Sequence, residues 1–145
     1  HAAGQAAVRI PFLHLGVESA RALAGELGPG ARVGLLASSA VARVELFEQS
    51  FADQALQVVY PGAPAQARLM ALIRSVKADG SEVGIANLKP AVDDLLAAPA
   101  DGLLIACSEL SAVSEGVEAA LAGRQAPVLD SAEILAQAIV REARS

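Results

Sequence analysis

"DGLLIACSEL", residues 101–110, opens with a short apolar run and closes in polar residues. The run over 102–106 has the length and composition of a buried strand, and Cys107 follows it directly. A second segment, "VGLLASS" (33–39), repeats the pattern of an apolar run that ends in small polar residues. We therefore expect two strands of one sheet, each followed by polar side chains.

Further apolar runs alternate with stretches of helical periodicity. This alternation is typical of βαβ units, in which helices cover both faces of a parallel sheet. It predicts an α/β fold with a parallel sheet of about four strands flanked by helices, plus a terminal strand and helix. We expect strands at 8–14, 32–37, 56–60, 102–106 and 126–129, and helices at 17–27, 40–54, 64–78, 86–98 and 132–144. The segment from Asp130 to Glu133 reads as a capping box at the start of the last helix.

Composition excludes several classes of function. A chain of 145 residues is long enough to bury a core without disulfides or metals. Its net charge of -5, with no cluster of Lys or Arg, predicts neither a nucleic-acid nor a membrane partner. The apolar runs are far shorter than the roughly 18 residues that span a bilayer. A single cysteine without zinc-type spacing predicts no metal site and favours a cytoplasmic location.

Cys107 and a pair of serines are the candidate functional residues. Cys107 lies between a predicted strand and a predicted helix, where backbone N–H groups and the helix dipole favour a thiolate; a small buried hydrophobe is the alternative. Ser38 and Ser39 follow the strand at 32–37. The carboxyl ends of parallel strands share one edge, where open α/β sheets bind ligands, although both serines also suit a helix N-cap.

Several segments together resemble the aspartate/glutamate racemase family. "IACSEL" (105–110) is similar to the family's Gly-Cys-Thr-Glu motif, with Ala106 in place of Gly and Ser108 in place of Thr. The other similar segments, in family order, are "IPFLHL" (10–15), "VGLLAS" (33–38), "VVYP" (58–61) with Gln66, "IRSVKADG" (73–80) and "PVLDSAEILAQAIV" (127–140). The resemblance covers the chain from Ile10 onward.

The resemblance implies a cofactor-independent amino-acid racemase of the aspartate/glutamate type, in which two cysteines from two α/β lobes face opposite sides of the substrate's α-carbon. It assigns Cys107 as one acid/base group, with Ser108, Ser38 and Ser39 at the α-carboxylate. The resemblance implies that Lys77 binds the distal carboxylate of an acidic amino acid. The alternative interpretation is a solvent-exposed lysine at the end of a helix. Glu109 orients Cys107 or binds the substrate ammonium, unless it is a cap or a surface residue. A core histidine is the better interpretation of His14.

The resemblance also divides the chain. Residues 11–122 correspond to the second lobe, 123–145 to a strand and helix that return to the first lobe, and 1–10 to a remnant of that lobe or a linker. The family's first cysteine motif, Cys-Asn-Thr-x-x-His, is absent, and His1 is a candidate for its last residue. With one acid/base group, two alternatives stay open: a single-cysteine decarboxylase or isomerase of the same superfamily, and a non-catalytic carboxylate-binding module. The resemblance allows a homodimer.

Overall fold

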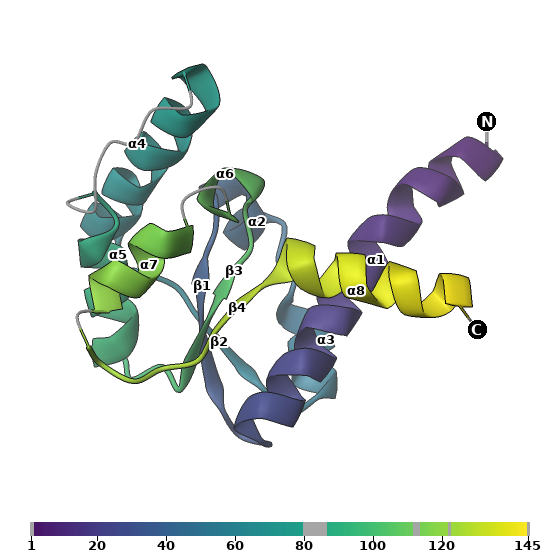
Figure 1. The fold of residues 1–145 in the computed structure, drawn as a ribbon, viewed down its shortest axis with the longest axis horizontal. Helices are drawn as coiled ribbons and strands as arrows, with labels where there is room; N and C mark the ends of the chain where they lie inside the picture. Colours follow the sequence, from purple (N-terminus) through teal and green to yellow (C-terminus); the bar gives the residue numbers. More distant parts are fainter. Residues whose placement is uncertain (1, 80–86, 112–113, 122, 145) are drawn as a thin grey trace.

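A four-stranded parallel sheet forms the centre of the fold (Figure 1). The computed structural model describes residues 2–79, 87–111, 114–121 and 123–144. Within these residues the strands lie in the order β2-β1-β3-β4, and all neighbours are parallel. The strands are β1 (Arg32–Leu36), β2 (Gln57–Val59), β3 (Gly102–Ile105) and β4 (Val128–Asp130). The predicted α/β class and parallel sheet are confirmed.

Helices cover both faces of this sheet, because alternate residues of each strand point to opposite sides. On β1, Leu35 packs with Phe47 and Phe51 in one core, and Leu36 packs with Leu69 in the other. The first core is covered by α1 (Ala2–Leu27) and α3 (Glu48–Asp53). The second core is covered by α4 (Ala63–Asp79), α5 (Lys89–Ala97) and α7 (Ser114–Leu121). Two short helices, α2 (Ser39–Arg43) and α6 (Ser108–Ser111), follow β1 and β3, and α8 (Ser131–Arg144) ends the described chain.

A glycine sets the spacing between β1 and the helix layer. A Cβ atom placed on Gly34 would lie 2.9 Å from side-chain atoms of both Leu103 and Leu95. Because a real Cβ does not tolerate that distance, any larger residue would push α5 away from the sheet. Gly34 therefore permits the close packing of α5 over β1 and β3.

The predicted strand at 8–14 is wrong, because these residues lie within α1. Residues 2–7 contain four alanines, the best helix formers, and the helix continues through Pro11 to Leu27. The predicted helix at 40–54 is divided into α2 and α3 by a turn at 44–47, where Glu45 adopts a φ of 52°. Phe47 ends that turn and Phe51 lies in α3; both are fully buried, and their rings are in edge-to-face contact with centroids 5.6 Å apart.

The end of the chain packs on its beginning. The start of α8 is capped by Asp130, whose Oδ1 accepts hydrogen bonds from the N–H groups of Ala132 (2.9 Å) and Glu133 (3.4 Å), as the capping box predicts. Further along, α8 contacts α1, and Arg141 forms an ion pair with Glu18 at 3.3 Å. The division into a second lobe (11–122), a returning segment (123–145) and a remnant (1–10) stays a prediction. Among the described helices, none has both the length and the apolar character that crossing a bilayer requires.

Candidate active site

The loops that follow β1 and β3 bring the predicted residues to one edge of the sheet. Leu36 of β1 pairs with Ile105 of β3, and the N–H of Ala106 donates to the carbonyl of Leu36 at 2.9 Å. Ser38 and Cys107 each come two residues after this pair. The two strand ends therefore carry Ser38 and Cys107 side by side at the carboxyl edge, as the parallel topology predicts.

Cys107 lies between β3 and α6, and its environment is mixed. The residue is half-buried and packs against the apolar core beneath the sheet. Its Sγ donates a hydrogen bond to Oε2 of Glu109 at 3.3 Å. The thiol is thus held at the edge of the sheet by a carboxylate two residues away, which supports the expected orienting role of Glu109.

The structure does not favour the predicted thiolate at Cys107. Burial raises the pKa of the thiol, and the hydrogen bond to Glu109 and its negative charge raise it further. The backbone N–H groups of Leu110 and Glu109 lower the pKa, as the helix-start argument predicts, but burial and the Glu109 carboxylate together outweigh them. At neutral pH Cys107 is therefore a protonated thiol, which suits the donation of a proton.

Ser38 and Ser39 begin α2, and neighbouring groups hold their loop. Ser38 occupies the N-cap position with extended backbone (φ -69°, ψ 158°), but its side chain makes no capping hydrogen bond. The N–H of Ser39 donates to Sδ of Met70 at 3.3 Å. Nε2 of Gln66 donates to the carbonyl of Ala37 at 2.9 Å and to Oγ of Ser39 at 3.3 Å. The hydroxyl of Ser38 is thus not committed to its own helix, which weakens the N-cap interpretation of that residue.

Two predicted ligands are placed only by their backbones. Ser108 is the first residue of α6 and follows Cys107 directly. Lys77 lies near the end of α4, roughly three turns beyond Gln66. In Figure 1 the end of α4 projects beyond the ends of the strands. The side chains of Ser108 and Lys77 lie outside the described part of the molecule, as does that of His14, so their roles stay predictions.

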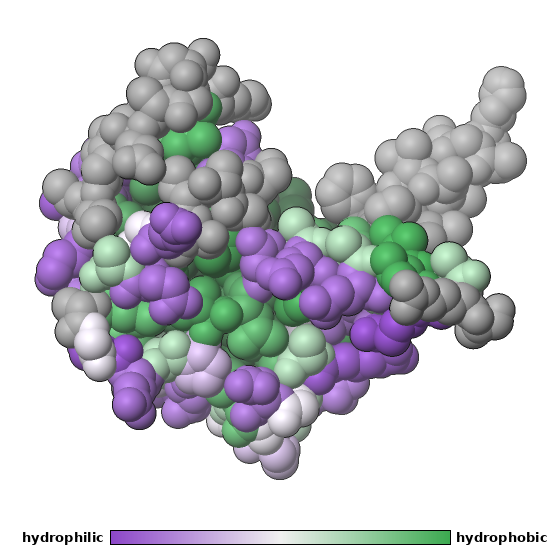
Figure 2. Space-filling model, viewed as in Figure 1, coloured by the Kyte–Doolittle hydropathy of each residue, from purple (hydrophilic) through white to green (hydrophobic). Residues whose placement is uncertain are grey.

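An acidic cavity of about 510 Å³ lies along β4 and reaches the carboxyl ends of β3 and β4 at Ile105 and Asp130. On the face that carries β4, Figure 2 shows hydrophobic surface bordered by hydrophilic residues. Apolar residues that line the cavity include Ile105 and Val128. Its acidic lining residues are Glu26, Glu115, Glu118, Asp130 and Glu133. Neither Cys107 nor Ser38 lines it. Carboxylates in this number repel an anionic substrate, so the strand-end loops are the better site for one.

Two polar contacts near the site were not predicted from the sequence. Gln66 is part of a segment that resembles the family, but nothing in its spacing indicated a bond to Ser39. The hydroxyl of Tyr60, just after β2, donates to Oε2 of Glu48 at 2.8 Å, and burial and Glu48 raise the pKa of Tyr60. No sequence pattern links these two residues. In the described part of the chain, no three His, Cys, Asp or Glu residues are grouped so as to hold a metal ion.

Comparison with known proteins adds one finding to this geometry. The model of the family described as Asp/Glu/Hydantoin racemase matches residues 1–139. Among curated proteins, none matches the chain. The family match spans nearly the whole sequence and includes both strand-end loops.

Proposed function

The chain belongs to the Asp/Glu/Hydantoin racemase family, and we propose that it contributes one acid/base group to a cofactor-independent racemase of acidic amino acids. The observation that carries the proposal is the half-buried thiol of Cys107 at the carboxyl edge, hydrogen-bonded to Glu109 and beside the loop of Ser38. The family match supports a racemase-type enzyme. The substrate class and the role of the cysteine are the proposed part.

Racemisation needs an acid and a base on opposite faces of the α-carbon. A group on one face takes the α-proton, and the electron pair of the broken C–H bond stays on the α-carbon as a carbanion. A thiol on the other face donates its proton to that carbanion and becomes a thiolate. Because burial keeps Cys107 protonated, it is ready for the donating role; in the reverse direction the thiolate takes the proton back. Glu109 holds the thiol by accepting its hydrogen bond.

The carbanion is stabilised when donors face the carboxylate into which its charge spreads. In this proposal the hydroxyls of Ser38, Ser39 and Ser108 face the α-carboxylate. Ser38 and Ser39 follow β1, and Ser108 follows Cys107 at the end of β3, so the proposal takes these donors from two neighbouring strand ends. Lys77 pairs with the distal carboxylate and accounts for a preference for aspartate or glutamate.

The test is conversion of L-aspartate and L-glutamate to their D-enantiomers, followed by chiral chromatography. The wild-type protein is expected to racemise one of the two, and Cys107→Ala is expected to lose at least about 100-fold in kcat. Circular dichroism of both proteins controls for folding. An undiminished rate in Cys107→Ala would refute the assignment of Cys107.

A single-sided reaction is the second candidate, and the raised pKa of Cys107 favours it, because such a reaction needs a proton donor on one face only. In a decarboxylase, CO₂ leaves with breakage of the Cα–carboxyl bond, and Cys107 donates one proton to the carbanion. Run in D₂O, such a reaction yields a product with one deuterium in a single configuration, whereas a racemase yields both.

Calorimetric binding of aspartate without any α-proton exchange would instead support a non-catalytic carboxylate-binding module.

A further inference from the structure

Gln66 joins α4 to the loop that carries the two serines. It is half-buried in the first turns of α4, and its Nε2 reaches two groups of the loop after β1. These are the carbonyl of Ala37, at 2.9 Å, and Oγ of Ser39, at 3.3 Å. One turn further along α4, Sδ of Met70 accepts the N–H of Ser39 at 3.3 Å.

The carbonyl of Ala37 fixes which end of the amide faces the loop. A carbonyl oxygen only accepts hydrogen bonds, so the group opposite it must be the donating nitrogen of Gln66 rather than its oxygen. Ala37 is only 2% exposed, so water does not replace this donor freely. The orientation of the amide therefore follows from hydrogen-bond chemistry and does not depend on telling nitrogen from oxygen by shape.

This orientation decides what Ser39 is able to offer a ligand. The amide nitrogen has no lone pair for accepting, so Oγ of Ser39 is the acceptor in their contact. The hydroxyl proton of Ser39 consequently points elsewhere. Since the N–H of Ser39 is directed at Met70, the hydroxyl proton is the donor of this residue that remains for a bound carboxylate.

We propose that Gln66 is a positioning residue, which holds the loop of Ser38 and Ser39 and makes the Ser39 hydroxyl a hydrogen-bond donor toward the substrate carboxylate. The inference deepens the proposed function and rests on it for the identity of the ligand. It predicts that Gln66 contributes to substrate binding through Ser39 without touching the substrate.

Gln66→Glu is the sharpest variant, because it keeps the shape and removes the donors. A carboxylate there accepts the Ser39 hydroxyl proton and repels both the Ala37 carbonyl and the substrate carboxylate. The dissociation constant of L-aspartate or L-glutamate, measured by calorimetry, is expected to rise roughly tenfold or more. In a turnover assay the effect is expected in kcat as well as in KM, because charge spreads into the carboxylate during proton transfer and the Ser39 donor then matters more.

Three further variants test whether the effect of Gln66→Glu comes from its added charge, from a loss of stability, or from the contact with Ser39. Gln57→Glu adds the same charge at an exposed position at the amino end of β2, and it is expected to bind like wild type. Gln66→Met keeps the length and removes the donors without adding charge, and it is expected to weaken binding even if Gln66→Glu lowers the melting temperature. In a Ser39→Ala background, Gln66→Met is expected to weaken binding less than it does in wild type, because the contact with Ser39 is already lost and only the bond to the Ala37 carbonyl remains to be removed.

The outcomes separate this inference from the racemase proposal. If the variants weaken binding non-additively while wild type exchanges no α-proton, the role of Gln66 stands and the racemase proposal falls. If wild type does exchange the α-proton and Gln66→Met and Gln66→Glu bind as wild type does, the inference alone falls. Fully multiplicative effects of Gln66→Met and Ser39→Ala also overturn it, and absence of binding by wild type overturns both proposals.

Discussion

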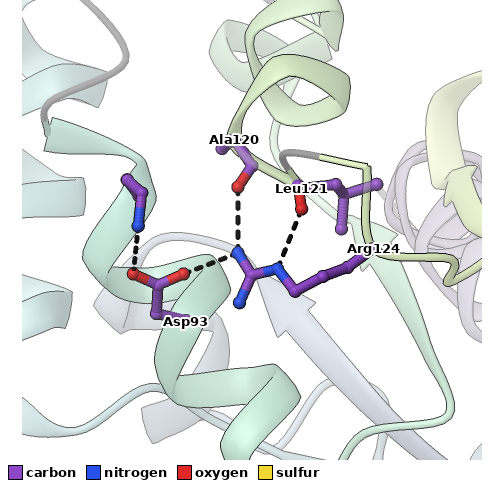
Figure 3. Close-up of polar contacts among 5 residues, drawn as sticks. Asp93, Ala120, Leu121 and Arg124 are labelled. Atoms are coloured by element: carbon purple, nitrogen blue, oxygen red, sulfur yellow. Dashed lines mark hydrogen bonds and ion pairs between the residues drawn. The ribbon is translucent and has the colours of Figure 1, made fainter.

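Two polar clusters of this molecule differ in what surrounds them. At the carboxyl edge of the sheet, Cys107 and Glu109 share a hydrogen bond of 3.3 Å between half-buried groups. At the end of α7, Arg124 pairs with Asp93 at 2.6 Å and donates to the carbonyls of Leu121 and Ala120 at 2.8 and 3.0 Å (Figure 3). Lys89 adds a second ion pair to Asp93 at 2.8 Å. The second cluster has the shorter contacts, but its ionic side chains are exposed.

The difference teaches that short contacts do not identify a site. The side chains of Arg124 and Asp93 are 42% and 38% exposed, so water screens their attraction. The hydrogen bonds from Lys89 and then Arg124 lower the pKa of Asp93, which favours its charged form. At Cys107, burial instead raises the pKa and keeps the group protonated. The strand-end cluster has altered chemistry, whereas the Arg124 cluster joins α5 to the end of α7.

Alkylation of Cys107 is expected to have the largest effect on activity, and it tests the strand-end cluster. Iodoacetamide is expected to modify the one cysteine of the chain and to reduce racemisation by at least about 100-fold, the lower range for loss of an acid/base group. In the proposed site the substrate lies against the sulfur, so L-aspartate or L-glutamate is expected to slow the modification. The readouts are intact-mass spectrometry and residual activity, taken from the same samples.

Cys107→Ala serves as the matched control, since it has no thiol to label. Modification that leaves activity intact, or that proceeds equally fast with and without either amino acid, would place the sulfur away from the substrate.

Replacing Glu109 by Gln sharpens the comparison by removing a charge from the strand-end cluster. Burial is the main cause that raises the pKa of Cys107, and the Glu109 carboxylate is the next raising cause, so Glu109→Gln is expected to lower that pKa. The alkylation rate follows the thiolate, so its rise with pH is expected to begin at lower pH in the variant. If the midpoint pH of the alkylation rate in Glu109→Gln stayed at the wild-type value or moved to higher pH, Glu109 would not be a cause of the raised pKa of the thiol.

Replacing Arg124 by Ala is the smallest expected effect and tests the structural side. The free energy of unfolding is expected to fall by about 1 kcal/mol or less at neutral pH, measured by urea denaturation. Asp93 has a lowered pKa, so its ion pairs stabilise the fold above the ordinary carboxyl range, and the contribution is lost as pH falls through that range. The difference between variant and wild type is therefore expected to narrow in acid. If Arg124→Ala changed KM or the midpoint pH of Cys107 alkylation, the Arg124 cluster would not be independent of the strand-end cluster.

The central strands were predictable because their apolar runs are unambiguous. Leu35 and Leu36, or Leu103 and Leu104, face opposite cores, so the strand has no polar side and the run is continuous. Residues 8–14 were wrongly predicted as a strand because "VRIPFLH" is also a short apolar run. The alanines before it favour a helix. The division of the helix at 40–54 could not be foreseen, since the turn at 44–47 depends on the burial of Phe47 and Phe51.

The position of Cys107 was predictable from topology, and its pKa was not. A residue after a parallel strand must lie at the carboxyl edge, whatever surrounds it. The pKa depends on how far the sulfur sinks into the core and on the distance to Glu109, which only the folded chain defines. The contact of Gln66 with Ser39 likewise depends on how α4 packs beside β1.

The most direct test of the central assignment follows the α-proton itself. Wild-type protein and Cys107→Ala are incubated in D₂O with L-aspartate and with L-glutamate, and the α-proton signal is followed by ¹H NMR. We expect wild type to exchange the α-proton of one of these amino acids and to yield deuterated D-enantiomer, and we expect Cys107→Ala to yield none above the uncatalysed rate. Equal rates of deuterated D-enantiomer formation in the two proteins would contradict the assignment of Cys107 as an acid/base group.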